Sequence, residues 1–181
     1  MKNSIILLFI ILGCLIETPI YSQDIFPIDK ETGEIVYSGV VNVDSTNSKE
    51  LYVRAHEWFA NTFKSAKDVI QLDDKEAGKI VGKGFYDAGI PKSYGGIIHS
   101  PLIGSVNFTV EIQTKDGKYK YVFTIFSWQD IDLKSASIRR DVLVQKSLDK
   151  DWLEIKKDVN ARMLAIIDGL KKSMSTNSDN W

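Results

Sequence analysis

Apolar and polar side chains alternate along two runs that flank Asp116-Gly117, one from Val106 to Lys115 and one from Lys118 to Trp128. Alternation predicts strands with one buried face, and an Asp-Gly pair between such runs predicts the turn of a β-hairpin. With Lys115 opposite Lys118, the apolar face pairs Ile112 with Tyr121, Val110 with Phe123 and Phe108 with Ile125. The other face pairs Gln113 with Lys120, Glu111 with Val122, Thr109 with Thr124 and Asn107 with Phe126. A shift of one residue would mix the two faces, so the pattern specifies this register.

Two segments repeat apolar residues at helical spacing. The first follows Asn47, which can cap a helix together with Glu50, and extends to about Phe63. The second extends from Asp149 to about Met174. Their apolar residues are Leu51, Ala55, Trp58, Phe59 and Phe63 in the first, and Trp152, Ile155, Val159, Met163, Ile166, Ile167 and Leu170 in the second. Each helix therefore needs a surface on which to bury its apolar stripe.

The remaining pattern predicts further strands at Glu34–Val43, Asp68–Leu72 and Lys79–Asp87. Prolines and glycines between Ala88 and Pro101 predict a loop there. The segment 129–146 is ambiguous, and Val142-Leu143-Val144 in it could add a short strand. The order β-α-β-β-β-β-α predicts an α+β fold, in which a curved antiparallel sheet carries two helices on one face.

Length and composition fit a single globular domain. The chain has 181 residues, of which 44% are hydrophobic and 26% charged, and its formal net charge is −1. No cluster of lysine and arginine dominates, so we expect no nucleic-acid partner.

The first residues have the layout of a signal peptide. Lys2 precedes an apolar run from Ile5 to Ile16 that is too short to span a bilayer, and Ser22 offers a cleavage site before Gln23. The alternative is a lipoprotein signal, in which Cys14 would carry a lipid. We expect an exported protein that is periplasmic, envelope-associated or secreted, and that touches a membrane only through the signal peptide or that lipid. The expected division is 1–22 signal peptide, 23–33 lead-in, 34–174 one α+β domain and 175–181 polar tail.

Several short motifs resemble those of a known family. They are Glu34-Ile35-Val36-Tyr37, Glu50-Leu51-Tyr52 with Trp58, Asp74, and Gly78 to Gly84. From Glu34 to Trp128 the chain resembles an uncharacterised family of exported, Bacteroidetes-type domains of unknown function with a fold like that of the TATA-binding protein. The resemblance implies this fold and export, and it implies no catalytic residue. DNA binding does not follow from the fold label.

No motif for catalysis, metal or cofactor binding is complete. The segment Gly78 to Gly84 has the wrong spacing for a phosphate loop, and the acidic run at Asp73 lacks the ligand pattern of a calcium loop. His99 has Asp87 and Ser100 near it in the chain, which leaves a serine hydrolase open as an alternative function. We otherwise expect no catalytic residue, no metal and no cofactor.

The most informative polar face is that of the predicted hairpin opposite the core. Phe126 and Trp128 would lie on it beside Asn107 and Thr109, and aromatic rings beside hydrogen-bonding groups are common in binding surfaces. Alternatively, the segment 129–146 or the mature N-terminus covers the two rings. We therefore expect a non-catalytic envelope or secreted module that binds a protein, glycan or small molecule.

Overall fold

The structure is a computed structural model that describes residues 25–63, 65–94, 97–128, 131–132 and 142–176. The predicted signal peptide, most of the ambiguous segment before residue 142 and the end of the polar tail lie outside the described residues. The elements in chain order are β1 (Tyr37–Asn42), α1 (Ser48–Thr62), α2 (Ala66–Val69), β2 (Ile70–Asp74), β3 (Lys79–Tyr94), β4 (Ile97–Lys115), β5 (Lys118–Trp128), β6 (Ile131–Asp132) and α3 (Val142–Ser175).

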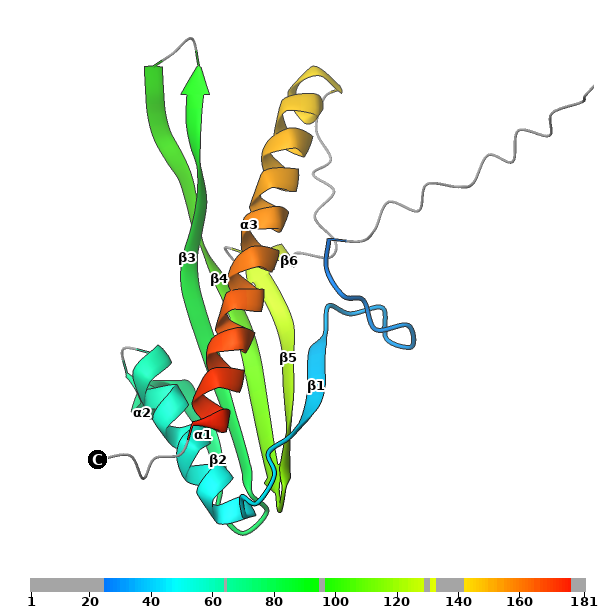
Figure 1. The fold of residues 1–181 in the computed structure, drawn as a ribbon. Coiled ribbons are helices and arrows are strands. Elements are labelled where there is room, and N and C mark those ends of the chain that lie inside the picture. Colours follow the sequence, from blue (N-terminus) through cyan, green and yellow to red (C-terminus); the bar gives the residue numbers. More distant parts are fainter. Residues whose placement is uncertain (1–24, 64, 95–96, 129–130, 133–141, 177–181) are drawn as a thin grey trace, which may run out of the picture.

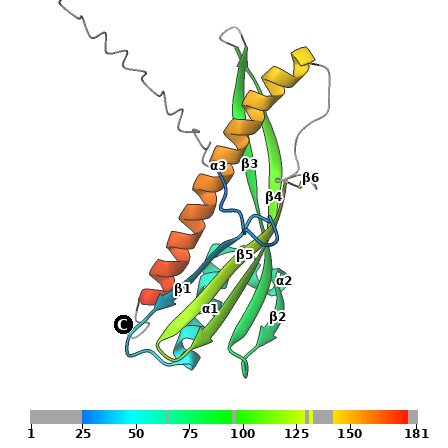
Figure 2. The ribbon, with the colours of Figure 1, turned by 90° about the vertical axis from the view of Figure 1, so that its right-hand side faces the viewer.

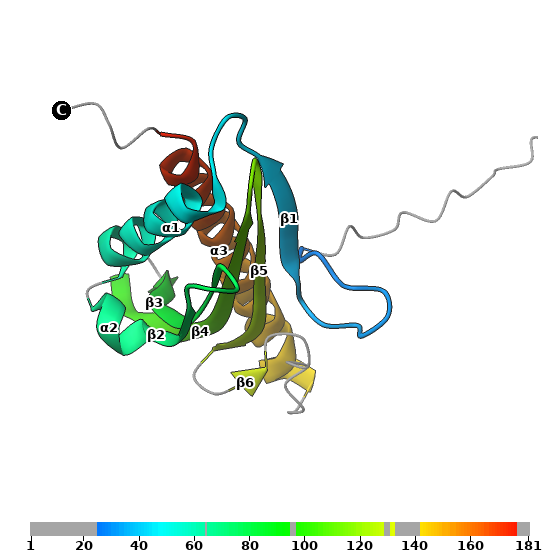
Figure 3. The same cartoon turned by 90° about the horizontal axis from the view of Figure 1, so that it is seen from below.

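The described strands form one antiparallel sheet, in the order β1-β5-β4-β3-β2, with β6 paired to β5 beyond the end of β1. The helices α1 and α3 lie side by side on one face of this sheet (Figures 1, 2 and 3). The predicted α+β class, with two helices on one face of an antiparallel sheet, is therefore confirmed. The first part of the predicted strand Asp68–Leu72 is instead the short helix α2.

The central hairpin has the predicted register from Lys115↔Lys118 up to Thr109↔Thr124. Beyond that point the register shifts, and Asn107 pairs with Ser127 instead of Phe126. The shift is a β-bulge, in which one extra residue of β5 lies opposite Phe108. A bulge reverses which face later residues occupy, so Phe126 comes to the same face as Phe123.

The hairpin turn predicted at Asp116-Gly117 is present, but it is not of the type I′ that such a pair commonly forms. A type I′ turn needs positive φ at both central residues, but only Gly117 has it, at 74°. A single left-handed residue at the second central position is typical of a type II turn. Contacts with the segment before α1 hold this turn. The Ser48 amide donates to Asp116 Oδ1 (2.7 Å), and the Gly117 amide donates to the Thr46 carbonyl (2.8 Å).

Helix α1 begins as predicted, because Asn47 Oδ1 accepts a hydrogen bond from the Glu50 amide at 2.8 Å. Its buried side chains pack on two glycines of β3. A Cβ on Gly82 would lie 2.6 Å from Phe59, and one on Gly84 would lie 2.7 Å from Phe63. The missing side chains of Gly82 and Gly84 thus make room for the aromatic rings of α1 and its C-cap.

Helix α3 begins at Val142, so the short strand considered for Val142–Val144 is wrong. Its apolar stripe packs on the sheet as predicted, and the side chain of Trp152 lies outside the described residues. The buried members of the stripe are Ile155, Val159, Met163, Ile167, Leu170 and Met174. The end of α3 is fixed by buried Arg54 of α1, whose Nη1 donates to the Met174 carbonyl at 2.9 Å.

The predicted loop from Ala88 to Pro101 is wrong. The strands β3 and β4 continue through it and pair with each other as far as Tyr94↔Ile97. They form an arm that projects beyond β5 and β1 (Figure 1). Pro91 lies at a register shift between Ile90 and Lys92, and a bulge is one of the few places in a ladder where proline fits.

Candidate functional site

The face of the sheet opposite α1 and α3, here called the outer face, carries the side chains that alternate with the core. On β3, for example, Gly82 and Gly84 face the helices, so Lys83 and Phe85 face outward. The outer-face residues are Ser38, Val40 and Asn42 of β1, Leu72 and Asp74 of β2, Lys79, Val81, Lys83, Phe85 and Asp87 of β3, Ser105, Asn107, Thr109, Glu111, Gln113 and Lys115 of β4, and Lys118, Lys120, Val122 and Thr124 of β5.

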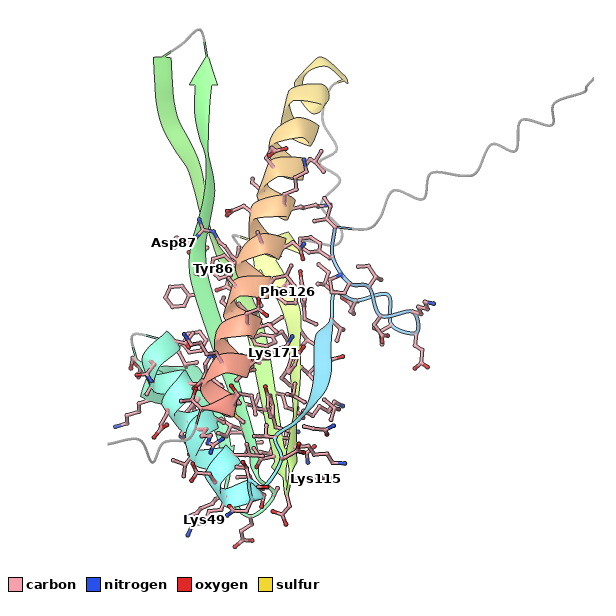
Figure 4. The ribbon with its side chains drawn as sticks, viewed as in Figure 1. Lys49, Tyr86, Asp87, Lys115, Phe126 and Lys171 are labelled. Carbon is pink, nitrogen blue, oxygen red and sulfur yellow. The ribbon has the colours of Figure 1, made fainter. Side chains whose placement is uncertain are left out.

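Two of the predicted site residues lie where we expected them. Asn107 and Thr109 are on the outer face and half-buried. The predicted position of Phe126 on this face is wrong. Its side chain is only 6% exposed and packs against the rings of Phe108, at 6.2 Å between centroids, and Tyr37, at 5.6 Å (Figure 4). The bulge of β5 turns Phe126 into the core, where burial of its ring offsets the disturbed ladder. The side chain of Trp128 lies outside the described residues.

The exposed aromatic ring of the outer face is Phe85, which the sequence reasoning missed. Its side chain is 63% exposed, and its neighbour across β4 is Asn107. The sequence contained a signal for the outward position of Phe85. Gly82 and Gly84 pack under a helix, and successive residues of a strand alternate between its two faces, so Lys83 and Phe85 must face away from that helix. Single exposed apolar side chains are common, but an aromatic ring beside a hydrogen-bonding side chain is a frequent feature of binding surfaces. Phe85 thus takes the place that we had assigned to Phe126.

The outer face is also rich in lysine. Lys79 forms an ion pair with Glu111 across β3 and β4, with 2.9 Å between Nζ and Oε2. Lys83, Lys115, Lys118 and Lys120 are exposed, and none of them pairs with a carboxylate within the ranges that the structure describes. A hollow of about 200 Å³ at the lower end of the sheet is lined by Val40, Gln113, Lys115, Lys118, Tyr119 and Lys120.

At the base of the arm, Ser105 Oγ donates to Asp87 Oδ1 at 3.0 Å (Figure 4). This pair does not extend to His99. The backbone of His99 pairs with Lys92, which is about 17 Å further along β3 than Asp87 at the usual rise of a strand. Ser100 follows His99 directly in β4, so Asp87 is distant from both, and the three residues considered as a hydrolase site are not brought together.

A second polar cluster joins α1 to β2. The Tyr52 hydroxyl donates to Asp73 Oδ1, and His56 Nε2 lies 2.9 Å from the same oxygen. Burial, together with the hydrogen bond to Asp73 and its negative charge, raises the pKa of Tyr52 to about 12. The hydrogen bond from Tyr52 is the main cause that lowers the pKa of Asp73. A tyrosine with so high a pKa is a poor nucleophile at neutral pH, so this cluster fits a structural link better than a catalytic site.

Two further searches cover only the described residues. They find no group of three or more histidine, cysteine, aspartate or glutamate side chains placed to hold a metal ion. They also find no helix with the length and apolar character needed to cross a membrane.

The comparisons with known proteins identify the family. The model of a domain of unknown function, DUF4468, with a TBP-like fold matches residues 37–129. The chain belongs to this family. The matched residues run from β1 through β5, so they contain the whole outer face. Helix α3 lies beyond them although it supplies much of the core. A comparison with curated proteins gives no match.

Two crystal structures share the DUF4468 fold with this chain. One is a DUF4468 family protein from Bacteroides ovatus ATCC 8483, which is 14% identical with a TM-score of 0.57 and aligns over 87% of this chain and 94% of its own. The other is a TBP-like protein from Parabacteroides distasonis ATCC 8503, which is 11% identical with a TM-score of 0.53 and aligns over 82% and 98%. At these identities the likeness concerns the fold alone, which is that of a DUF4468 domain.

Proposed function

We propose that this DUF4468 chain is an exported, non-catalytic module that binds a component of the cell envelope or surroundings through its outer face. The observation that carries the proposal is Phe85. Its ring is 63% exposed on β3, just beyond the stretch of β3 that pairs with β2, with the amide of Asn107 directly across the ladder. Such a ring supplies contact area, while neighbouring polar groups supply direction, which is a common composition of binding surfaces.

Export is the second part of the proposal and rests on the sequence. The apolar run from Ile5 to Ile16 after Lys2, followed by Ser22, has the layout that a signal peptidase recognises. Cell fractionation with mass spectrometry of the N-terminus tests it. The expected product begins at Gln23 or carries a lipid on Cys14, and a cytoplasmic protein that still begins at Met1 would overturn it.

The binding part is tested with isolated cell envelopes of the organism that encodes the chain. The purified mature protein is mixed with the envelopes and sedimented, and the bound fraction of wild type is compared with that of Phe85→Ser. Leu164→Ser on α3 is the matched control, because Leu164 is 48% exposed on the opposite side of the molecule. We expect Phe85→Ser to lose most of the bound fraction and Leu164→Ser to keep it. Equal binding of all three proteins would exclude the outer face as the contact surface.

A further inference from the structure

We propose that the ligand of the outer face is an acidic polysaccharide, whose carboxylate or sulfate groups are bound by Lys83, Lys115, Lys118 and Lys120. This inference rests on the proposed function and names the chemical class of its ligand. The chain as a whole has a net charge of −1, yet lysines outnumber carboxylates on this face. The face is therefore far more positive than the rest of the molecule, which favours a negatively charged partner.

Protection of sheet edges does not explain the lysines of β5. Lysine often occupies edge strands, where it prevents pairing with other chains. Lys118 and Lys120 are on β5, which pairs with β1 on one side and with β4 on the other at these positions, whereas Lys83 lies just past Gly82, where the pairing of β3 with β2 ends. Lys115 and Lys118 even lie directly opposite each other, an arrangement that destabilises a ladder. An anion bound between them would remove this repulsion.

The other groups of the face suit a sugar chain. Asn107, Thr109 and Gln113 offer amides and a hydroxyl along β4, and these groups can both donate to and accept from sugar hydroxyls. Phe85 offers a flat apolar surface at one end of this row. From Asn107, opposite Phe85, to Lys115 the row is about 27 Å long at the usual strand rise, which is enough for several sugar units.

A peptide partner fits the face less well. Extended peptides commonly bind by adding a strand to a sheet edge, where backbone groups are free. Around Lys118 and Lys120 the backbone groups of β5 are paired with β1 and β4, so only side chains remain for contact there. Side chains that combine cations, amides, hydroxyls and one ring match a polymer of acidic sugars.

The test measures binding of the mature protein to immobilised polygalacturonate and heparin by biolayer interferometry. Lys83→Gln/Lys120→Gln should weaken both Kd values by about tenfold, the effect of two charge-assisted contacts of moderate strength. The control Lys67→Gln/Lys172→Gln has the same net charge, and both of its lysines are exposed on helices. It should bind within about twofold of wild type. Raising the salt concentration should weaken wild-type binding, because exposed charges are screened.

Three results would overturn the inference. They are absent binding to both acidic polysaccharides, equal loss in the two double variants, and tighter binding to polyglutamate or to vesicles of anionic phospholipid than to either polysaccharide. None of these three results decides the outcome of the envelope experiment with Phe85→Ser, which tests the proposed function separately. If that variant still loses envelope binding, the outer face is a binding surface for another class of ligand. If it does not, the proposed function itself fails. Thermal melts of all variants show whether each is folded.

Discussion

At the scale of residues, two phenylalanines of the sheet, one on β5 and one on β3, have opposite environments. Phe126 is 6% exposed and contacts Phe108 and Tyr37, whereas Phe85 is 63% exposed. The difference arises from one extra residue in β5 and from two glycines in β3. The same residue type can therefore serve stability at one position and remain free for contact at the other.

We predict that Phe126→Ala lowers the free energy of unfolding by about 3–5 kcal/mol, because it leaves a cavity between Phe108 and Tyr37. Phe85→Ala should change it by less than about 0.5 kcal/mol, because its ring is mostly in water. Urea unfolding of both variants and wild type measures the two effects. Equal losses would mean that the bulge, and with it the assignment of faces, is wrong.

The bulge marks the limit of what alternation could predict about the site. Ile125 and Phe126 are both apolar, so either of them can occupy the core face without leaving a polar residue buried. The pattern specified the register as far as Thr109↔Thr124 and could not detect an insertion after it. Asn107 and Thr109 were placed correctly because β4 runs through this region without an extra residue.

At the scale of elements, composition was a weaker guide than tertiary pairing. Prolines and glycines predicted a loop at Ala88–Pro101, but each strand of the arm supplies the other with backbone partners. Val142-Leu143-Val144 has strand propensity, yet it begins a long helix whose later turns pack on the sheet. The two main helices were predictable because their apolar stripes persist over several turns.

The contact of α1 with the end of α3 gives a prediction for a buried charge. Arg54 is 3% exposed and donates to the Met174 carbonyl and to Glu50 Oε1. Arg54→Met should cost about 1–3 kcal/mol, because it leaves the buried Met174 carbonyl without this donor. The control is Arg162→Met on α3, which breaks an exposed ion pair with Asp158 and should cost less than about 1 kcal/mol. Thermal or urea unfolding compares the two, and similar costs would contradict the proposed role of Arg54.

The link between α1 and β2 predicts a dependence of stability on pH. The pKa of Asp73 is lower in the folded protein than in the unfolded chain. The contribution of ionised Asp73 to the free energy of unfolding is therefore complete above about pH 5. It is lost as the pH falls through the pKa that Asp73 has in the folded protein. The stability difference between wild type and Asp73→Asn should shrink as the pH falls from about 5 to 2, and that of Tyr52→Phe should shrink with it. Urea unfolding across this range provides the measurement, and a constant difference would exclude the link as a source of stability.

At the scale of the whole molecule, the two-layer architecture was predictable from the sequence. Each long helix has an apolar stripe, and the apolar face of the predicted sheet was the surface on which that stripe could be buried. The antiparallel sheet, the order of its longer elements and the side on which both long helices lie were predicted, whereas α2 and β6 were not. The candidate binding face was predicted as a place, the side of the hairpin away from the helices, but its exposed aromatic residue, Phe85, was not. Local patterns define faces well, whereas exposure depends on insertions and on packing between distant segments.

The order of the strands also has a consequence for how the chain folds. Among the described strands, β1 pairs with β5 alone. The hydrogen bonds of β1, from Tyr37 onward, can therefore form only after Phe123 and the rest of β5 have been synthesised. The core is closed only when α3 follows, at the end of the described chain. Contacts between residues so far apart in sequence slow folding, since a long loop must close before they are made. The complete sheet and core therefore cannot form before nearly all of the described chain has been synthesised.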